Sequence, residues 1–132
     1  MTEKLQLYKC NVCGNIVEVV NSGVGTLVCC SVPMCKLEEH KNDDEMNEKH
    51  VPVVVMEGEN QIIRVGSIEH PMVKEHYITF IEAISHDKKY LKRKYLMPDE
   101  APKMDVQGCD YKNFTAREYC NLHGLWANEH KE

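Results

Sequence analysis

A cysteine and a histidine stand three positions apart near the end of the chain, at Cys120 and His123. A thiolate and an imidazole at this spacing can reach one metal ion from a tight turn, and Gly124 directly after them permits such a turn. The same pair is also compatible with ordinary core packing. Its meaning therefore depends on which other ligand-type side chains the fold brings to the same place.

Four further cysteines are grouped in the first 30 residues. Cys10 and Cys13 form a Cys-x-x-Cys-Gly knuckle, in which two sulfurs approach one ion and Gly14 permits the turn beneath them. Cys29 and Cys30 are adjacent, and successive side chains on a strand point to opposite faces, so both can bind one ion only if the backbone twists between them. This grouping predicts a distorted tetrahedral metal site, which suits zinc and a single iron equally well.

The composition limits the class of protein. The chain has 132 residues, a net charge of −5, and 42% hydrophobic and 28% charged residues, which is typical of one globular domain or of one domain with a small appendage. A negative charge without a basic stripe argues against nucleic acid as a partner. No apolar run approaches the ~20 residues that span a bilayer, so no membrane segment is expected.

Cysteine and histidine are both abundant, with seven residues of each. The N-terminus, Met1-Thr2-Glu3-Lys4-Leu5-Gln6-Leu7, has no apolar signal core. We therefore expect a cytoplasmic protein, in which cysteines serve metal or redox chemistry rather than disulfides.

The residue pattern divides the chain into three parts. Residues 1–36 contain short β runs at 16–20 and 26–28 and form a small module. Residues 37–47 are dominated by charges and amides, which predicts a solvated linker. Residues 48–132 contain longer β runs at 51–56, 61–65, 76–84, 90–97 and 114–120, and no convincing amphipathic helix. The predicted fold class is all-β: a small metal-stapled β module followed by an immunoglobulin-like antiparallel β-sandwich.

Four of the seven histidines lie at the edges of these predicted elements. His50 and His76 start strands, His70 is held in extended backbone by Pro71, and His123 lies in the terminal turn. Side chains at such edges can converge on one end of a sandwich, although each histidine alone is more often a surface residue. The surface interpretation is kept for His40, His86 and His130.

The first module resembles the desulforedoxin-type domain of the desulfoferrodoxin family. The resemblance rests on Tyr8-Lys9-Cys10, on Cys13-Gly14-Asn15-Ile16-Val17-Glu18-Val19, on Leu27-Val28-Cys29-Cys30 and on Pro33-Met34. It implies a homodimeric protein with one iron per module, held by Cys10, Cys13, Cys29 and Cys30. The family commonly has glycine after the cysteine pair, where this chain has Ser31; if that position needs a positive φ, the local turn differs. No ligand role is expected for Cys35 or Cys109.

The second part resembles the iron-binding segments of superoxide reductases, in the same order. The segments are 48–53, 65–72, 75–78 and 118–124, so that the resemblance covers nearly the whole chain. It implies a two-iron superoxide reductase whose second iron is bound by His50, His70, His76 and His123 roughly in a plane and by Cys120 on one axis. The sixth position would be open to superoxide. Five ligands also exceed the four of structural zinc and do not match a blue-copper centre.

The resemblance further implies a reaction and the roles of two side chains. Superoxide would take up one electron and two protons to give hydrogen peroxide, with rubredoxin or a similar small redox protein as the electron donor. The thiolate of Cys120 would donate electron density to the iron, as in haem-thiolate enzymes. Lys49 would attract the anion to a protein that is acidic overall, and Glu48 would occupy the sixth position of the ferric iron after the product leaves.

Two other classes of protein stay open at this point. One is a zinc-binding interaction module, in which the four N-terminal cysteines bind zinc and the histidines are idle. The other is a pure electron carrier that uses only the four-cysteine iron. Metal content and the visible spectrum separate them, because two irons per chain support the reductase and a colourless zinc protein excludes it.

Overall fold

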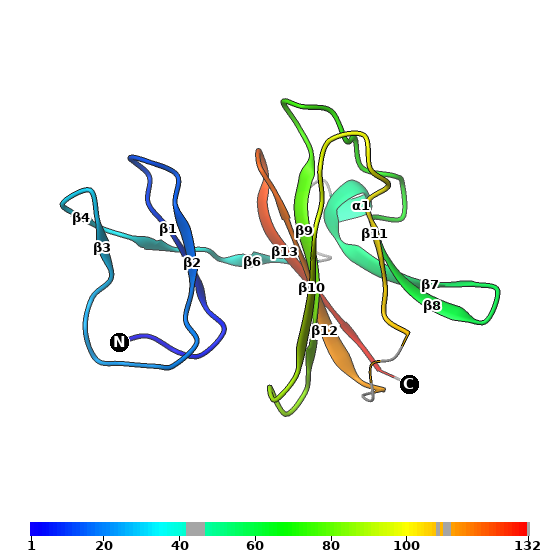
Figure 1. The fold of residues 1–132 in the computed structure, drawn as a ribbon, viewed down its shortest axis with the longest axis horizontal. Coiled ribbons are helices and arrows are strands. Elements are labelled where there is room, and N and C mark those ends of the chain that lie inside the picture. Colours follow the sequence, from blue (N-terminus) through cyan, green and yellow to red (C-terminus); the bar gives the residue numbers. More distant parts are fainter. Residues whose placement is uncertain (42–46, 108, 110–111, 132) are drawn as a thin grey trace. The chain divides into compact units, whose positions relative to one another are not determined.

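The computed structural model describes residues 1–41, 47–107, 109 and 112–131 (Figure 1). These residues form two compact units, Met1–Glu38 and Glu39–Glu132. Within the predicted linker 37–47, Glu39–His40 form strand β6 of the second unit, whereas residues 42–46 lie outside the described part. No helix of the described chain is long and apolar enough to cross a membrane.

The first unit is built from very short strands. Strand β1 (Leu7–Lys9) lies between β2 (Ile16–Glu18) and β5 (Cys35–Lys36), and β3 (Val28–Cys29) pairs with β4 (Val32–Pro33). Among its described residues, the buried hydrophobic side chains are Leu7, Cys10 and Val19. So small a core does not stabilise a module of this length without a metal or a partner.

The second unit is a sandwich of two sheets, as the all-β prediction requires. The five-stranded sheet has the order β10 (Leu91–Tyr95), β9 (Ile78–Ser85), β12 (Phe114–Cys120), β13 (Gly124–His130) and β6 (Glu39–His40). The three-stranded sheet has the order β11 (Lys103–Asp105), β8 (Asn60–Val65) and β7 (Pro52–Glu57). All strand pairs of these sheets are antiparallel except β13 with β6, which is parallel.

The hydrophobic core lies between these two sheets. Side chains of one sheet, including Ile63, Val65 and Met104, pack against Ile81 and Phe114 of the other. In β9 and β12 alternate residues face this core, and Cys120 lies at its edge with no exposed surface. The core therefore fixes the end of β12 from which Cys120 projects.

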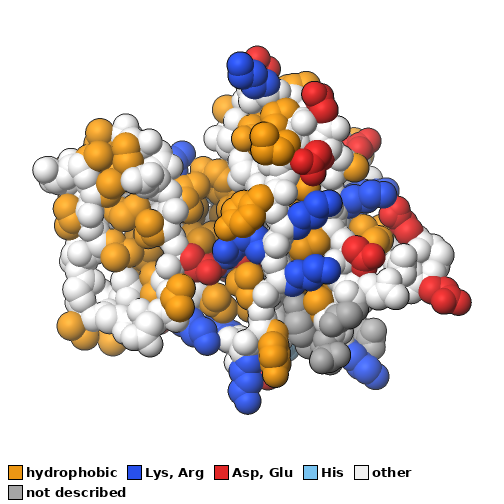
Figure 2. All heavy atoms as spheres, viewed as in Figure 1, with side chains coloured by type: hydrophobic (Ala, Val, Ile, Leu, Met, Phe, Trp, Pro, Cys, Tyr) orange, Lys and Arg blue, Asp and Glu red, His pale blue; other side chains and the backbone are white. Residues whose placement is uncertain are grey.

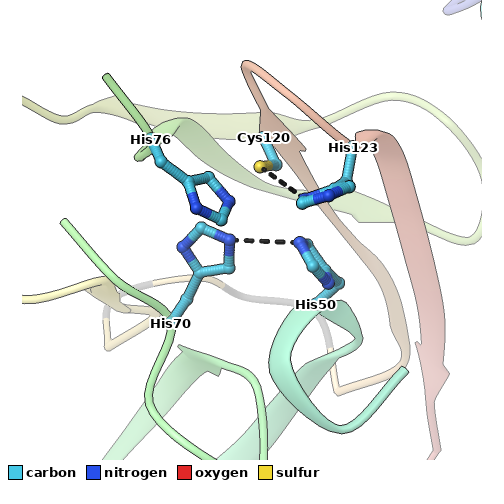
Figure 3. A group of neighbouring side chains, drawn as sticks. All are labelled: His50, His70, His76, Cys120 and His123. Carbon is cyan, nitrogen blue, oxygen red and sulfur yellow. Dashed lines mark hydrogen bonds between the residues drawn. The ribbon is translucent and has the colours of Figure 1, made fainter. Parts of the chain in front are cut away.

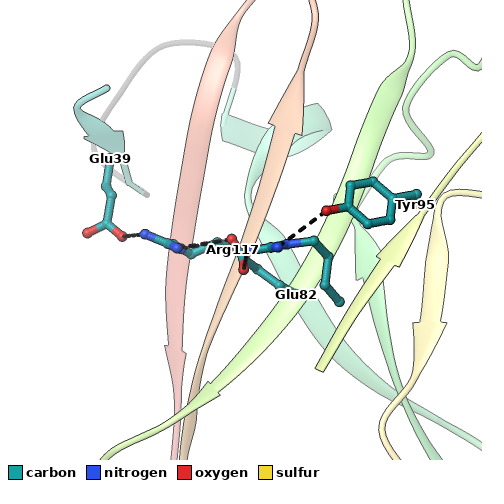
Figure 4. Close-up of polar contacts among 5 residues, drawn as sticks. Glu39, Glu82, Tyr95 and Arg117 are labelled. Atoms are coloured by element: carbon teal, nitrogen blue, oxygen red, sulfur yellow. Dashed lines mark hydrogen bonds and ion pairs between the residues drawn. The ribbon is translucent and has the colours of Figure 1, made fainter. Parts of the chain in front are cut away.

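Ion pairs connect the strands on the outer face of the five-stranded sheet. Glu82 on β9 is fully buried and forms ion pairs with Arg93 of β10 at 2.8 Å and with Arg117 of β12 at 3.0 Å (Figure 4). Arg117 also reaches Glu39 of β6 at 3.6 Å. Since the pairs involve four strands, they stabilise the sheet that carries Cys120 and His123 at one end.

The structure corrects three predicted local features. His50 does not start a strand but ends a one-turn helix, α1 (Asn47–His50). The predicted β runs end with 114–120, but the long strand β13 follows it. Three successive buried residues, Leu125 to Ala127, hide the alternation on which strand prediction depends. The strand predicted from His76 begins at Ile78, and His76 forms only an isolated bridge with Val73.

Candidate metal centres

Four histidines and one cysteine from distant parts of the second unit meet at one point. Their ligand atoms all lie within 4.8 Å of one another (Figure 3). The group consists of His50, His70, His76, Cys120 and His123. His50 and His70 are 2% exposed and Cys120 is fully buried, so the donors face each other rather than solvent. The structure thus brings together every side chain predicted for the second metal centre.

Three segments supply these five side chains. His50 comes from the end of α1, His70 and His76 from the loop between β8 and β9, and Cys120 and His123 from the end of β12 and the turn to β13 (Figure 3). A shift in strand register between Tyr119 and Cys120 lies directly at the ligand. Such bulges re-aim a side chain at a sheet edge, which here directs the Cys120 sulfur into the group.

Backbone contacts hold the first segment against the second. The carbonyl oxygen of Glu48 accepts hydrogen bonds from the Ser67 hydroxyl at 3.1 Å and from the Ile68 amide at 2.9 Å. A Cβ atom at Gly66 would lie 2.6 Å from that same carbonyl oxygen. Only glycine therefore lets the loop approach α1 this closely.

Asn121 holds the second segment against the third. Its side-chain oxygen accepts a hydrogen bond from the Tyr77 amide at 3.0 Å, and its side-chain nitrogen donates to the Glu75 carbonyl at 3.0 Å. The sequence analysis assigned no role to Asn121 or to Gly66. Asn121 follows a strand end, where asparagine side chains commonly bond to backbone, and this is the signal that could have found it.

Burial keeps the histidines in the form that binds metal. Desolvation lowers the pKa of His70 to about 4, although the ring donates from Nδ1 to the Pro71 carbonyl at 2.6 Å. Desolvation also lowers the pKa of His76, and the charges of His123 and Lys49 add to this. A metal ligand must be a neutral imidazole, and the bond from Nδ1 leaves Nε2 of His70 for the metal.

The residues fit a metal that accepts nitrogen and sulfur ligands. Nε2 of His76 is buried without a hydrogen-bond partner among the described residues, and Nε2 of His70 lies 3.1 Å from Nε2 of His50. Burial raises the pKa of Cys120, so a metal is needed to hold its thiolate. Five inward-facing nitrogen and sulfur donors suit iron, and they exceed the four ligands of a structural zinc site.

The four N-terminal cysteines form a second group within the first unit. The ligand atoms of Cys10, Cys13, Cys29 and Cys30 lie within 4.8 Å of one another. The sulfur of Cys29 lies 3.6 Å from that of Cys13 and 3.9 Å from that of Cys30. Cys35 is not in this group; its sulfur accepts a hydrogen bond from the side-chain nitrogen of Asn11 at 3.2 Å.

The predicted backbone twist at the cysteine pair is present. Cys30 has a φ of 53° and Ser31 a φ of 63°, both in the left-handed region. The reversal at Cys30 lets two adjacent side chains reach the same point. The position after the pair therefore does require a positive φ, and Ser31 adopts it, at a cost of about 1 kcal/mol relative to glycine.

Cys10, Cys29 and Cys30 differ in acidity in the absence of a metal. A hydrogen bond from the Cys13 backbone amide lowers the pKa of Cys10 to about 6. Contact with the Cys13 sulfur raises the pKa of Cys29 and raises that of Cys30 to about 12. The raised pKa values of Cys29 and Cys30 indicate that metal binding must release protons from these two thiols, so metal affinity falls as the pH falls.

The two predicted catalytic residues lie on α1. Glu48 and Lys49 are exposed and directly precede the ligand His50. The charge of Lys49 lowers the pKa of His76, which places its positive field at the metal centre. Their catalytic roles stay predictions.

Known proteins match both units. The desulfoferrodoxin family model matches residues 42–129, and the model of the desulfoferrodoxin N-terminal domain matches residues 2–37. The chain is 52% identical to a desulfoferrodoxin homolog of Archaeoglobus fulgidus, over 97% of this chain and 99% of the relative. It is 47% identical to a desulfoferrodoxin of Syntrophotalea carbinolica, over 98% and 99%. The crystal structure of the superoxide reductase from Treponema pallidum superposes with a TM-score of 0.72 at 28% identity, over 97% of this chain and 99% of that one. Together with the two clusters of ligand side chains, these matches show that the chain belongs to the desulfoferrodoxin family.

Proposed function

We propose that this chain reduces superoxide to hydrogen peroxide at an iron held by His50, His70, His76, Cys120 and His123. The observation that carries the proposal is the buried convergence of these five donors within 4.8 Å. The superoxide reductase of Treponema pallidum, which matches nearly the whole chain, supports it. In the reaction, superoxide, one electron and two protons give hydrogen peroxide, and no dioxygen forms.

An iron bound by these five side chains would supply one electron to superoxide at this site. The chain's own residues make this site suitable. Desolvation keeps His70 and His76 neutral, so the imidazoles add no positive charge of their own. The thiolate of Cys120 would donate electron density to the iron and offset part of the metal charge.

We assign the attraction of superoxide to Lys49 and the binding of ferric iron through a carboxylate oxygen to Glu48. Lys49 is exposed on α1, and its charge acts on His76. In a chain of net charge −5, a local cation at the site counters the repulsion of an approaching anion. The carboxylate of Glu48, which directly precedes Lys49 on α1, would offer an oxygen ligand to ferric iron.

A second iron at the four-cysteine group is proposed to stabilise the first module. The module buries few hydrophobic side chains, so metal binding contributes directly to its folding. We further propose functional limits of 1–36 for the desulforedoxin-like domain, 37–47 for the linker and 48–132 for the catalytic domain. The family matches at 2–37 and 42–129 are compatible with them.

The partners are proposed from chemistry and from the exposed surface. Rubredoxin or a similar small redox protein would supply the electron that each turnover consumes.

Hydrophobic side chains gather over the first unit in Figure 2, and six exposed valines belong to it: Val12, Val17, Val20, Val24, Val28 and Val32. Exposed apolar surface of this kind supports a homodimer. A cytoplasmic location is compatible with seven cysteines of which none forms a disulfide.

Metal analysis with a visible spectrum tests the function against its alternatives. We expect two irons per chain and a thiolate-to-ferric absorption band that appears on oxidation with superoxide. Consumption of superoxide should yield hydrogen peroxide without dioxygen. A colourless zinc protein, or iron at the four-cysteine group alone, would reject the reductase.

Replacing Lys49 with alanine tests the attraction of superoxide. The second-order rate constant, measured after pulsed generation of superoxide, should fall about tenfold and lose much of its dependence on ionic strength. Lys131→Ala is the matched control, because it removes an exposed charge near the C-terminus. An unchanged rate and salt profile in Lys49→Ala would remove this residue from the mechanism.

A further inference from the structure

Trp126 contacts two metal ligands from different segments, and the reaction described above assigns it no part. It lies on β13 and is 2% exposed. Its indole ring stacks on the imidazole of His50, with ring centroids 4.9 Å apart and an interplanar angle of 20°. Its Nε1 donates a hydrogen bond to the carbonyl oxygen of His123 at 3.0 Å.

These contacts complete the connections among the three ligand-bearing segments. Ser67 and Ile68 connect α1 to the β8–β9 loop, and Asn121 connects that loop to the β12–β13 turn. Trp126 connects α1 to the β12–β13 turn. The ring contact limits rotation of the His50 imidazole, while the hydrogen bond fixes the backbone that carries His123.

The indole is itself held in place. The ring of His40 lies 4.9 Å from it at 39°, because β6 runs beside β13 and pairs His40 with Trp126. Cross-strand pairing with Glu118 fixes Trp126 on its other edge. A large side chain that two neighbouring strands hold in place restricts the orientation of the metal ligands it contacts.

We propose that Trp126 is a positioning residue for the iron centre, one that sets the ring orientation of His50 and the place of His123. The inference rests on the proposed function for its relevance to superoxide, but its measurable consequence is metal retention. Outer contacts of metal ligands typically change metal affinity 10–100-fold when removed.

Two substitutions separate the two contacts. Trp126→Phe keeps an aromatic ring against His50 and removes the hydrogen bond to His123, whereas Trp126→Leu removes both. We expect the ferrous protein to lose the iron of the five-ligand centre to a chelator about tenfold faster in Trp126→Phe and about 100-fold faster in Trp126→Leu. The thiolate-to-ferric band should shift in both variants, since the ligand geometry changes. Iron at the four-cysteine group should be retained.

Phe114→Leu is the matched control for loss of core packing. Phe114 is 1% exposed on the same strand as Cys120, about 20 Å along it. This variant should lower the thermal midpoint yet keep the iron-release rate and the absorption band of the wild type. If Trp126→Leu does not fold, Trp126→Phe decides alone.

The proposal is overturned if Trp126→Phe releases iron at the wild-type rate with an unshifted band, or if Phe114→Leu produces the same changes. These outcomes are distinct from failure of the proposed function. A wild-type chain that holds iron at the five-ligand centre but does not reduce superoxide would reject the function and leave the Trp126 inference standing.

Discussion

Glu118 is a buried carboxyl group two residues before the ligand Cys120. It is fully buried, and neither carboxyl oxygen has a hydrogen-bond partner among the described residues. Burial raises its pKa well above the ordinary value of 4.5, so the folded chain holds it protonated where the unfolded chain ionises it. Its contribution to stability is therefore full below pH 4.5 and is lost as the pH rises towards the folded pKa.

Glu118→Gln should remove this pH dependence, because the amide cannot ionise in either state. The wild-type free energy of unfolding should fall by roughly 1.4 kcal/mol per pH unit above the unfolded pKa, and the variant should lack that slope. Thermal midpoints of the iron-loaded protein between pH 5 and pH 8 measure this pH dependence of stability. Glu59→Gln, at an exposed turn position, is the control and should keep the wild-type slope. Equal slopes in Glu118→Gln and the wild type would contradict the assignment.

At the scale of residues, the ligands were predictable and their supports were not. Thiol and imidazole groups reveal themselves by type and spacing, and all nine predicted metal-binding side chains lie in one of the two groups. Trp126, Asn121 and Gly66 act through contacts with segments distant in sequence. A tryptophan, an asparagine or a glycine carries no sign of such a contact until the fold is known.

At the scale of elements, helix α1 is stabilised by its contact with the loop between β8 and β9 rather than by its own hydrogen bonds. A single helical turn has almost no intrinsic stability. It rests on the loop at Gly66, where an added Cβ would lie 2.7 Å from the Lys49 carbonyl carbon and 3.0 Å from the His50 amide nitrogen. The position of one ligand and of both proposed catalytic residues thus depends on the absence of one side chain.

Gly66→Ala should displace α1 and misplace His50. We expect iron affinity at the five-ligand centre to fall at least tenfold, and activity to fall with it, while the four-cysteine iron stays bound. Iron per chain and the rate with superoxide measure the change. Gly25→Ala serves as the control, because nothing lies within 4 Å of its added Cβ and its φ is not positive. Full iron loading in Gly66→Ala would contradict the prediction, because the loop would then accommodate the added Cβ without displacing His50.

The elements that the sequence pattern missed have one of two physical causes, burial on both faces or short length. Strand β13 is buried on both faces over Leu125 to Ala127, so it shows no alternation. Helix α1 is too short for a helical period, and β11 has only three residues. In contrast, Phe114–Cys120 has one continuous β pattern and was predicted with its observed bounds.

At the scale of the whole molecule, each metal centre belongs to one compact unit. Cys10, Cys13, Cys29 and Cys30 all lie within Met1–Glu38, and the five-donor group lies within Glu39–Glu132. No side chain of either group belongs to the other unit. The larger unit has its own hydrophobic core, whereas the smaller unit depends on its metal.

Removing the first metal should therefore leave the second intact. Cys13→Ser should lose the four-cysteine iron and unfold the first unit, yet keep one iron per chain and a rate with superoxide within about twofold of wild type, because the two groups lie in separate units and share no ligand side chain. Cys35→Ser is the matched control, since this exposed thiol of the same unit lies outside the group and should leave both irons bound. Loss of both irons in Cys13→Ser would mean that the larger unit needs the smaller one to fold. Iron analysis, the visible spectrum and the superoxide rate of the same samples decide between these outcomes.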